Sequence, residues 1–395
     1  MVVALTSINF FFKGGKIMDL KKEEIDKTYN QIAEELTISE SVYESSKASY
    51  DELAKYLSNT IGYNVNIYPQ GSMALGTTIK TITKNDDYDL DVVCEVEGNF
   101  DNPKKLKNLI GDALKNSGMY KKMLDNEGKR CWTLNYSSKN FHLDILPATP
   151  ISSESTKIII TNKDENTKEY SFKTSNPKAY ANWFLSKQEK EKNELIKRFY
   201  NKNDSIEPLK DYKVHTKLQK AVQLLKRHRD IKYKDASDEE RKNKPISIII
   251  TTILAELYNE NYSLYELLEC FANNAIKIID TDDNGNYIIS NPINKEENFA
   301  DKWIKYPERK KAFFEWIKEV KFDLITNNFL TKEDKIKQAN YLKCLFGDSV
   351  VSNVYSKQAL NYKSLSNKYI SHDDVATIST QKTDTQIKGH TFYGI

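Results

Sequence analysis

An apolar segment interrupted by two acids places the tightest constraint on how this chain can fold. Residues 88–96 read YDLDVVCEV, so Asp89 and Asp91 alternate with Leu90 and Val92. Successive side chains of an extended strand point to opposite faces, so both carboxylates lie on one face and the apolar pair on the other. Adjacent carboxylates repel each other, and burying unpaired charge costs free energy. The pattern therefore predicts a strand with one face on a core and the other face at a cation.

A third acid and a small-residue turn extend this prediction. Asp144 lies in a second short apolar segment, residues 141–147 (FHLDILP), and Gln70, Gly71 and Ser72 precede the first strand. Carboxylate oxygens suit Mg²⁺, and three of them can hold two ions that activate a hydroxyl and stabilise a departing pyrophosphate. The turn lets backbone amides and a hydroxyl approach phosphate oxygens. Together these segments predict a nucleotidyl-transfer site with Mg²⁺ or Mn²⁺ as cofactor.

Simpler interpretations apply to several of these residues. An isolated Asp-x-Asp pair is more often a turn or a solvated strand edge, but here the acids lie inside an apolar strand, where unpaired charges have no structural purpose. Asp86 and Asp87 fall in a polar segment and are interpreted as loop acids. His142 alternates onto the face of Asp144 without a surrounding His/Cys cluster. We interpret His142 as a cavity-lining or hydrogen-bonding residue rather than a metal ligand.

The motif Gly71-Ser72, Asp89-x-Asp91 and the later Asp144 resembles that of the polymerase-β-like nucleotidyltransferase superfamily, and more narrowly that of the bacterial cGAS/DncV-like nucleotidyltransferases (CD-NTases). The resemblance implies that Gly71 and Ser72 contact the donor phosphates. It also implies that Asp89 and Asp91 bind both metal ions, while Asp144 binds the ion that activates the hydroxyl. Members of this family make cyclic nucleotide second messengers in anti-phage defence.

Three later segments continue the resemblance over most of the chain. Residues 175–184 resemble the start of the family's helical half, and residues 291–300 resemble its nucleotide-proximal loop. Residues 218–230, followed by 244–247, resemble the region that contacts the donor triphosphate.

Without the family, residues 218–230 are predicted to form an amphipathic helix with a polar stripe beside its apolar face. Lys226 flanks the apolar face and is our predicted phosphate ligand, with a solvated lysine as the equal alternative. Ser247 begins an apolar run, where its hydroxyl either caps a helix or faces the triphosphate.

Length, charge and cysteine content limit the class of protein. A chain of 395 residues suits two domains around a cleft. The 59 basic and 56 acidic residues give a net charge of +3, so no stable nucleic-acid partner is expected. Four dispersed cysteines fit reduced thiols in the cytoplasm, and no apolar run is long enough to span a membrane.

The chain is expected to be an α+β protein with a polymerase-β-like lobe, made of a mixed sheet with helices, and a helical second lobe. The active site would lie in the cleft between them. Lys13-Gly14-Gly15-Lys16 before Met18 reads like a translated ribosome-binding site, so Met18 is the expected native start. The predicted boundaries are residues 1–17 for a non-native leader, 18–170 for the catalytic lobe with an N-terminal helix, 171–350 for the helical lobe and 351–395 for a C-terminal tail.

The expected function is template-independent synthesis of a cyclic di- or oligonucleotide from NTPs. A downstream effector would sense the product, and the tail is a candidate contact for a regulatory protein. Two alternatives stay open: a linear RNA-tailing nucleotidyltransferase, and a non-catalytic nucleotide-binding protein on the same fold. Near-neutral charge argues against the first alternative, and the intact set of three acids argues against the second.

Overall fold

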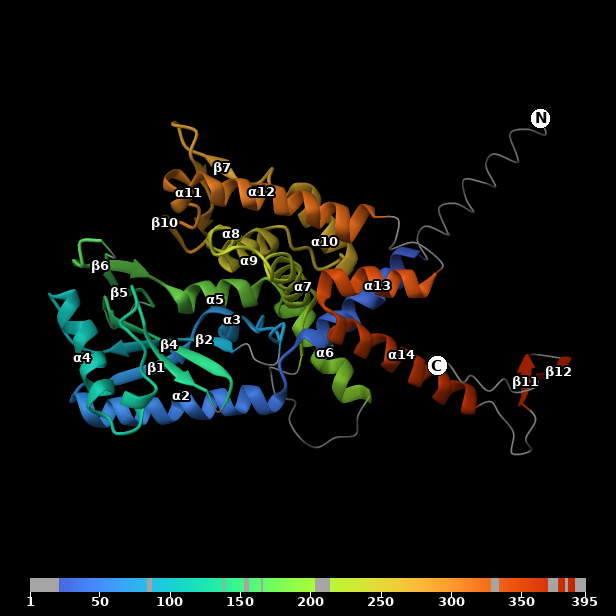
Figure 1. The fold of residues 1–395 in the computed structure, drawn as a ribbon, viewed down its shortest axis with the longest axis horizontal. Coiled ribbons are helices and arrows are strands. Elements are labelled where there is room, and N and C mark those ends of the chain that lie inside the picture. Colours follow the sequence, from blue (N-terminus) through green and yellow to red (C-terminus); the bar gives the residue numbers. More distant parts are fainter. Residues whose placement is uncertain are drawn as a thin grey trace.

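A computed structural model describes most of the chain and shows a sheet-based lobe beside a helical lobe (Figure 1). The residues described are 21–83, 87–137, 139–152, 156–164, 166–202, 214–327, 334–368, 376–380 and 383–387. The predicted leader and residues 388–395 lie outside them. No helix in these ranges is long and apolar enough to cross a bilayer.

The sheet-based lobe is built on a six-stranded mixed sheet. Its order is β1-β2-β4-β5-β6, with β3 also paired to β4. Strands β2 and β4 run parallel and the other pairs are antiparallel. The strands are β1 (Val65–Pro69), β2 (Tyr88–Val96), β3 (Trp132–Tyr136), β4 (Phe141–Pro150), β5 (Ile158–Lys163) and β6 (Tyr170–Ser175).

Two helices cover the sheet face opposite the acids. Leu90 and Val92 of β2 are buried in one core with residues of α2 (Glu40–Ile61) and α4 (Pro103–Asn116). Ser39 caps the start of α2 by accepting a hydrogen bond from the Val42 amide. Helix α4 lies between β2 and β3 in the sequence, which provides the long connection that a parallel β2–β4 pair requires.

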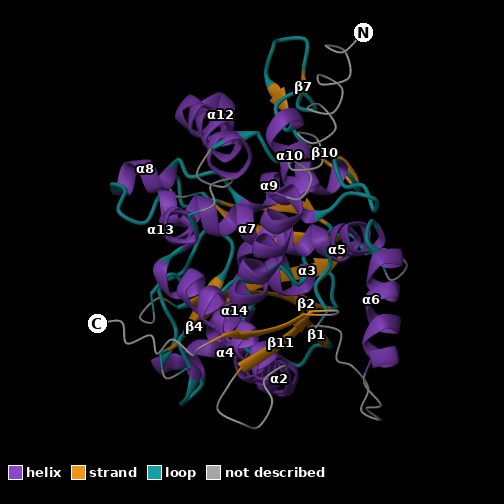
Figure 2. Ribbon diagram, turned by 90° about the vertical axis from the view of Figure 1, so that its right-hand side faces the viewer, coloured by secondary structure: helices purple, strands orange, loops and turns teal. Residues whose placement is uncertain are grey.

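Helix α7 is the central element of the helical lobe. Figures 1 and 2 both show β1, β2 and β4 on one side of α7, and α9, α10 and α12 on the other. The helices are α5 (Pro177–Ser186), α6 (Glu189–Lys202), α7 (Lys217–Lys232), α8 (Asp238–Lys242), α9 (Ser247–Glu256), α10 (Leu264–Asn274), α11 (Lys302–Lys305), α12 (Pro307–Lys321), α13 (Lys335–Phe346) and α14 (Asp348–Lys368). Three short ladders join β7 (Asp280–Thr281) to β8 (Tyr287–Ile288), β9 (Ser290–Asn291) to β10 (Asn294–Asn298), and β11 (Ala376–Thr380) to β12 (Thr383–Ile387).

The observed elements differ from the predicted boundaries at three places. The helix at residues 21–36 buries Tyr29 and Leu36 in the core of the helical lobe, although the prediction grouped it with the catalytic lobe. Strand β6 continues the sheet to Ser175, beyond residue 170. Helix α14 crosses residue 351, and Val351 and Val354 are buried in the helical core. Apolar periodicity predicts that a helix has a buried face, but it does not identify the lobe that covers this face.

Candidate active site

The parallel pairing of β2 with β4 brings the three predicted acids together. In this register Asp91 lies opposite Asp144, and Asp89 lies opposite His142. Side chains at paired positions of neighbouring strands share a face, so Asp89, Asp91 and Asp144 lie on one face of the sheet. Segments more than 50 residues apart in the sequence thus contribute carboxylates to one site.

Burial and mutual repulsion disfavour the ionised form of two of these carboxyl groups. Burial, followed by the negative charges of Asp144 and Asp89, raises the pKa of Asp91 to about 6. Burial and the charge of Asp144 also raise the pKa of Asp89. The site therefore holds more negative charge than the surrounding protein neutralises, as is expected where a cation or a cationic complex binds.

The carboxylates are adjacent but do not yet form a closed metal site. Among the residues that the structure describes, no three His, Cys, Asp or Glu side chains form a metal-ligand cluster. Asp144 is held by Thr133 on β3, whose Oγ1 donates to Asp144 Oδ1 at 2.5 Å. The site thus supplies the hard oxygen donors that Mg²⁺ prefers.

The turn before β2 approaches Asp91 closely because of a glycine. The Gln70 amide donates to the Asp91 carbonyl at 2.8 Å, and Gly71 starts the short helix α3 (Gly71–Leu75) with φ of +58°. A Cβ on Gly71 would lie 2.7 Å from Asp91 Oδ2, so a larger residue would push the carboxylate away. Ser72 Oγ, one residue later, accepts a hydrogen bond from Thr78 Oγ1 at 3.0 Å.

Lys226 and Ser247 lie on the helical side of the cleft, where both have protein partners. Lys226 Nζ donates to the Thr77 carbonyl at 3.0 Å, and burial, followed by the charge of Arg229, lowers its pKa to about 8. Ser247 Oγ accepts from Arg229 Nη1 at 2.8 Å. The N-cap of α9 is Ile246, with no side-chain cap, so the structure does not support the capping alternative for Ser247.

A series of side chains on α7 binds backbone carbonyls at the end of α3 and after it, an interface that the sequence analysis did not predict. Gln219 Nε2 donates to the Leu75 carbonyl at 2.9 Å, and Gln223 Nε2 donates to the Thr78 carbonyl at 3.1 Å. Arg227, only 1% exposed, donates to the carbonyl of Lys80 at 2.6 Å. The polar stripe beside the apolar face of this helix is the sequence feature that could have indicated this interface.

His142 is a hydrogen-bonding residue at the edge of the site, as predicted. Its Nε2 lies 2.8 Å from Asp87 Oδ2, and its Nδ1 lies 2.6 Å from Asn135 Oδ1. Asp87 therefore pairs with a strand residue rather than standing in solvent as a free loop acid. Asp86 lies outside the described residues.

Two cavities meet at Asp91. One, of about 720 Å³, is lined by Ser72, Lys226 and Ser247, among others. The other, of about 880 Å³, lies between β6 and α5 on one side and β10 and α11 on the other. Gly71 and Asp91 line both cavities. Each volume is in the range typical of small-molecule sites, so Asp91 lies where two ligands can meet.

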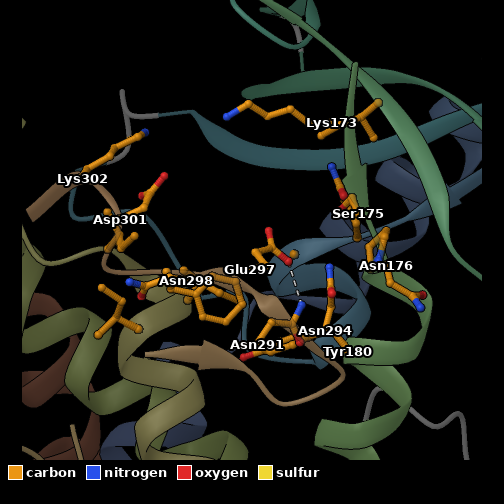
Figure 3. Close-up of a pocket in the computed structure, with 18 of the residues that line it drawn as sticks. Lys173, Ser175, Asn176, Tyr180, Asn291, Asn294, Glu297, Asn298, Asp301 and Lys302 are labelled. Carbon is orange, nitrogen blue, oxygen red and sulfur yellow. Dashed lines mark hydrogen bonds between the residues drawn. The ribbon is translucent and has the colours of Figure 1, made fainter. Parts of the chain in front are cut away.

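Polar side chains from residues 291–300 line the larger cavity. The sequence analysis identified this segment but no individual residue in it. Figure 3 shows Asn294 and Glu297 of β10 extending into the cavity. Glu297 Oε2 accepts from Asn291 Nδ2 at 2.8 Å, which fixes the carboxylate in position. Asn298, in contrast, uses its amide to bind the backbone of residues 287, 289 and 300, so its role is structural.

Known proteins resemble both the sequence and the fold. The second messenger oligonucleotide or dinucleotide synthetase domain matches residues 24–188. The chain is 31% identical over 304 residues to a c-di-GMP synthase of Roseivirga ehrenbergii, covering 75% of this chain and 77% of that protein. It is 25% identical over 301 residues to the cyclic dinucleotide synthase CdnG of Bradyrhizobium diazoefficiens, covering 71% of this chain and 70% of that protein.

A solved structure shares the architecture. The structure of the Bradyrhizobium diazoefficiens CD-NTase CdnG in complex with GTP matches with a TM-score of 0.67 at 22% identity, covering 86% of this chain and 99% of that one. This likeness confirms the predicted α+β fold, with a polymerase-β-like lobe beside a helical lobe.

Proposed function

The chain belongs to the bacterial CD-NTase family, and we propose that the acids of β2 and β4 join two nucleoside triphosphates into a cyclic dinucleotide. Synthesis of a cyclic oligonucleotide second messenger from NTPs follows from family membership. The residue roles, the metal, the base and the biological setting are our proposals.

The observation that best supports these roles is the position of Asp91 between two cavities, with Asp89 beside it at the smaller one. Asp91 borders both, and Asp144 lies opposite it in the register of the parallel strands. A donor triphosphate in the smaller cavity would face an acceptor hydroxyl from the larger one. Holding two reactants in this geometry removes much of the entropic barrier to transfer.

Mg²⁺ or Mn²⁺ fits the donor atoms and the electrostatics of the site. Asp89, Asp91 and Asp144 would hold it, since Gly71 leaves room that a Cβ would fill beside Asp91. When bound, the cation lowers the pKa of the attacking hydroxyl and neutralises the departing pyrophosphate.

The remaining residues would bind and orient the donor. The amide of Gly71 and the hydroxyl of Ser72 would contact its phosphates, and Lys226 and Ser247 would contact the triphosphate from the helical side. The Gln70 amide instead donates to the Asp91 carbonyl, so Gln70 would position Asp91 rather than bind phosphate. The Lys226 ammonium has three N–H donors. It could therefore donate to a phosphate oxygen as well as to the Thr77 carbonyl. Asp144 would accept the hydroxyl proton as the new phosphodiester forms.

We propose that guanine is the base, with c-di-GMP as the product. Both relatives compared above by sequence carry the names of cyclic dinucleotide synthases, one of them specifically of c-di-GMP. Guanine presents N–H donors beside an O6 acceptor. Glu297 and Asn294, which extend into the larger cavity, offer a carboxylate acceptor and an amide donor that match this pattern.

For the biological role, we propose synthesis in the cytoplasm as part of anti-phage defence, with an effector that senses the product. A regulatory protein that contacts the C-terminal tail is part of the same proposal. The support is family membership, and infection of cells that lack the gene is the corresponding test.

The product itself gives the decisive experiment. Purified protein is incubated with all four NTPs and Mg²⁺ or Mn²⁺, treated with phosphatase, and analysed by mass spectrometry. We expect a phosphatase-resistant product with the mass of c-di-GMP, and none in EDTA. Linear products alone would favour an RNA-tailing enzyme, and nucleotide binding without any product would favour the non-catalytic alternative.

A further inference from the structure

Three basic side chains from separate elements line the larger cavity, which neither Ser72 nor Lys226 lines. Arg130 precedes β3, Lys302 begins α11, and Arg309 belongs to α12. We call Arg130, Lys302 and Arg309 the basic cluster. Figure 3 shows Lys302 and, from β6 on the opposite wall, Lys173 both extending toward the same side of this cavity.

The basic cluster carries positive charge that the described residues do not neutralise. None of its three members forms an ion pair within the described ranges, whereas Lys244 in the same cavity pairs with Asp230 at 3.1 Å. After burial, the charges of Arg130 and Arg309 are the main causes that lower the pKa of Lys302. Asp301 opposes them only in part, so the cluster keeps a net positive charge.

Arg309 has a donor that lacks a partner. Its Nε is buried with no hydrogen-bond partner in the described structure, and its guanidinium lies 4.7 Å from the ring centre of Tyr306. A buried donor without a partner costs free energy, and Arg309 lines the cavity, so a shift of its side chain would bring this donor to a ligand acceptor.

A buried lysine fixes the loop that presents Arg130. Lys107 of α4 is fully buried, and its Nζ donates to the carbonyls of Gly128 at 2.5 Å and Lys129 at 2.9 Å. The Lys163 amide donates to the same Lys129 carbonyl at 2.8 Å. A rigid support of this kind keeps a binding side chain in place before the ligand arrives.

We propose that the basic cluster binds the 5′-triphosphate of the acceptor nucleotide, an inference that rests on the proposed function. The donor triphosphate is assigned to the other cavity, beside Ser72, which leaves the acceptor phosphates for this one. Guanidinium and ammonium groups are the usual protein ligands of phosphate oxygens.

The chemistry of ring closure explains why such a subsite is needed. In the first transfer, an acceptor ribose hydroxyl bonds to the donor α-phosphorus, pyrophosphate leaves, and the hydroxyl proton is released. The linear product keeps the acceptor's triphosphate, whose α–β phosphoanhydride bond breaks in the second transfer. An acceptor with fewer phosphates gives a linear product that cannot close. Selection of triphosphorylated acceptors at the basic cluster prevents this outcome.

Two GTP analogues, one that can only donate and one that can only accept, can test the subsite. 2′,3′-Dideoxy-GTP can only donate, because it has no ribose hydroxyl. Guanosine 5′-(α,β-methylene)triphosphate can only accept, because its α–β bridge cannot be cleaved. Linear product is measured against acceptor concentration, with the dideoxy donor saturating, for the methylene triphosphate and for guanosine. The proteins compared are wild type, Arg130→Gln, Lys302→Gln, and Lys305→Gln as an exposed control on α11 outside the cavity.

We expect Arg130→Gln and Lys302→Gln each to raise the KM for the methylene triphosphate by about tenfold. The KM for guanosine, the KM for the donor and the melting temperature should match those of Lys305→Gln. An unchanged KM for the triphosphate acceptor, or an equal rise with guanosine, would overturn the subsite alone. No transfer by the wild-type protein would overturn the proposed function, and the subsite with it.

Discussion

The paired strands β2 and β4 and the interface between α7 and residues 75–81 both place polar groups in buried surroundings, but by opposite means. On the strands, Asp91 lies beside Asp144 and Asp89, and burial with their repulsion raises its pKa to about 6. On α7, buried donors of Gln219, Gln223 and Arg227 meet backbone carbonyls, as Arg227 does at Lys80. One region keeps charges that oppose folding, while the other pairs buried side-chain donors with backbone carbonyls.

The contrast separates residues that serve chemistry from residues that serve the fold. Removing a carboxylate from the strands relieves repulsion, so it should cost activity but no stability. Removing a donor from α7 leaves a carbonyl without its partner, so it should cost stability. Lys226 belongs to both groups, because it bonds the Thr77 carbonyl and also lines the smaller cavity.

The largest effect is expected for the double variant Asp89→Asn/Asp91→Asn. Loss of two anionic ligands should reduce cyclic-product formation by at least about a thousandfold. The melting temperature should hold or rise because like charges are removed. Product quantification and thermal melting would be compared with Asp112→Asn, an exposed acid on α4. Wild-type synthesis by the double variant would remove the acids from the mechanism.

Arg227→Met should give the largest loss of stability. The side chain is almost fully buried and donates to the carbonyls of Lys80 and Thr81, so its loss should lower the free energy of unfolding by about 2–4 kcal/mol. Urea denaturation measures the change, with Lys232→Met at the exposed end of the same helix as control. Equal midpoints for the two variants would mean that this interface does not stabilise the fold.

The pH dependence of the free energy of unfolding should reveal the raised pKa of Asp91. Its pKa rises from 3.8 to about 6 on folding, so the folded state holds this proton more tightly than the unfolded chain does. Below about pH 4 both states carry the proton. Between about pH 4 and 6 only the folded state keeps it, so the free energy of unfolding falls as pH rises through this range. Asp91→Asn removes this loss. In EDTA, the variant should match wild type near pH 4 and exceed its unfolding free energy by about 3 kcal/mol above pH 6. Parallel stability curves would contradict the assignment.

Ser247→Ala should have the smallest effect. Arg229 Nη1 loses the Ser247 hydroxyl but keeps the Pro245 carbonyl, so the free energy of unfolding should fall by less than about 1 kcal/mol. If the hydroxyl contacts the triphosphate as proposed, the KM for the donor should rise about threefold or more. Steady-state kinetics with dideoxy-GTP as the donor measure this value. An unchanged KM would remove Ser247 from the donor site.

The sequence predicted the strands better than it predicted the contacts across the cleft. The period of two in residues 88–96 is local, so the shared face of Asp89 and Asp91 could be inferred directly. The alignment of Asp91 with Asp144 could not, because it depends on the register of a parallel pair joined through α4. The polar stripe on α7 was visible, but the carbonyls that it binds are about 150 residues away.

Thermal melting of wild type and Asp91→Asn, in EDTA and then with Mg²⁺ and GTP, tests most directly whether the carboxylates of β2 and β4 serve a cation rather than the fold. At pH 7 in EDTA we predict that Asp91→Asn melts at the higher temperature, because repulsion around Asp91 is relieved. With Mg²⁺ and GTP the order should reverse, because only the wild-type site gains the full binding free energy. A wild-type protein that melts higher in EDTA, or an equal shift of both proteins on adding Mg²⁺ and GTP, would contradict the account.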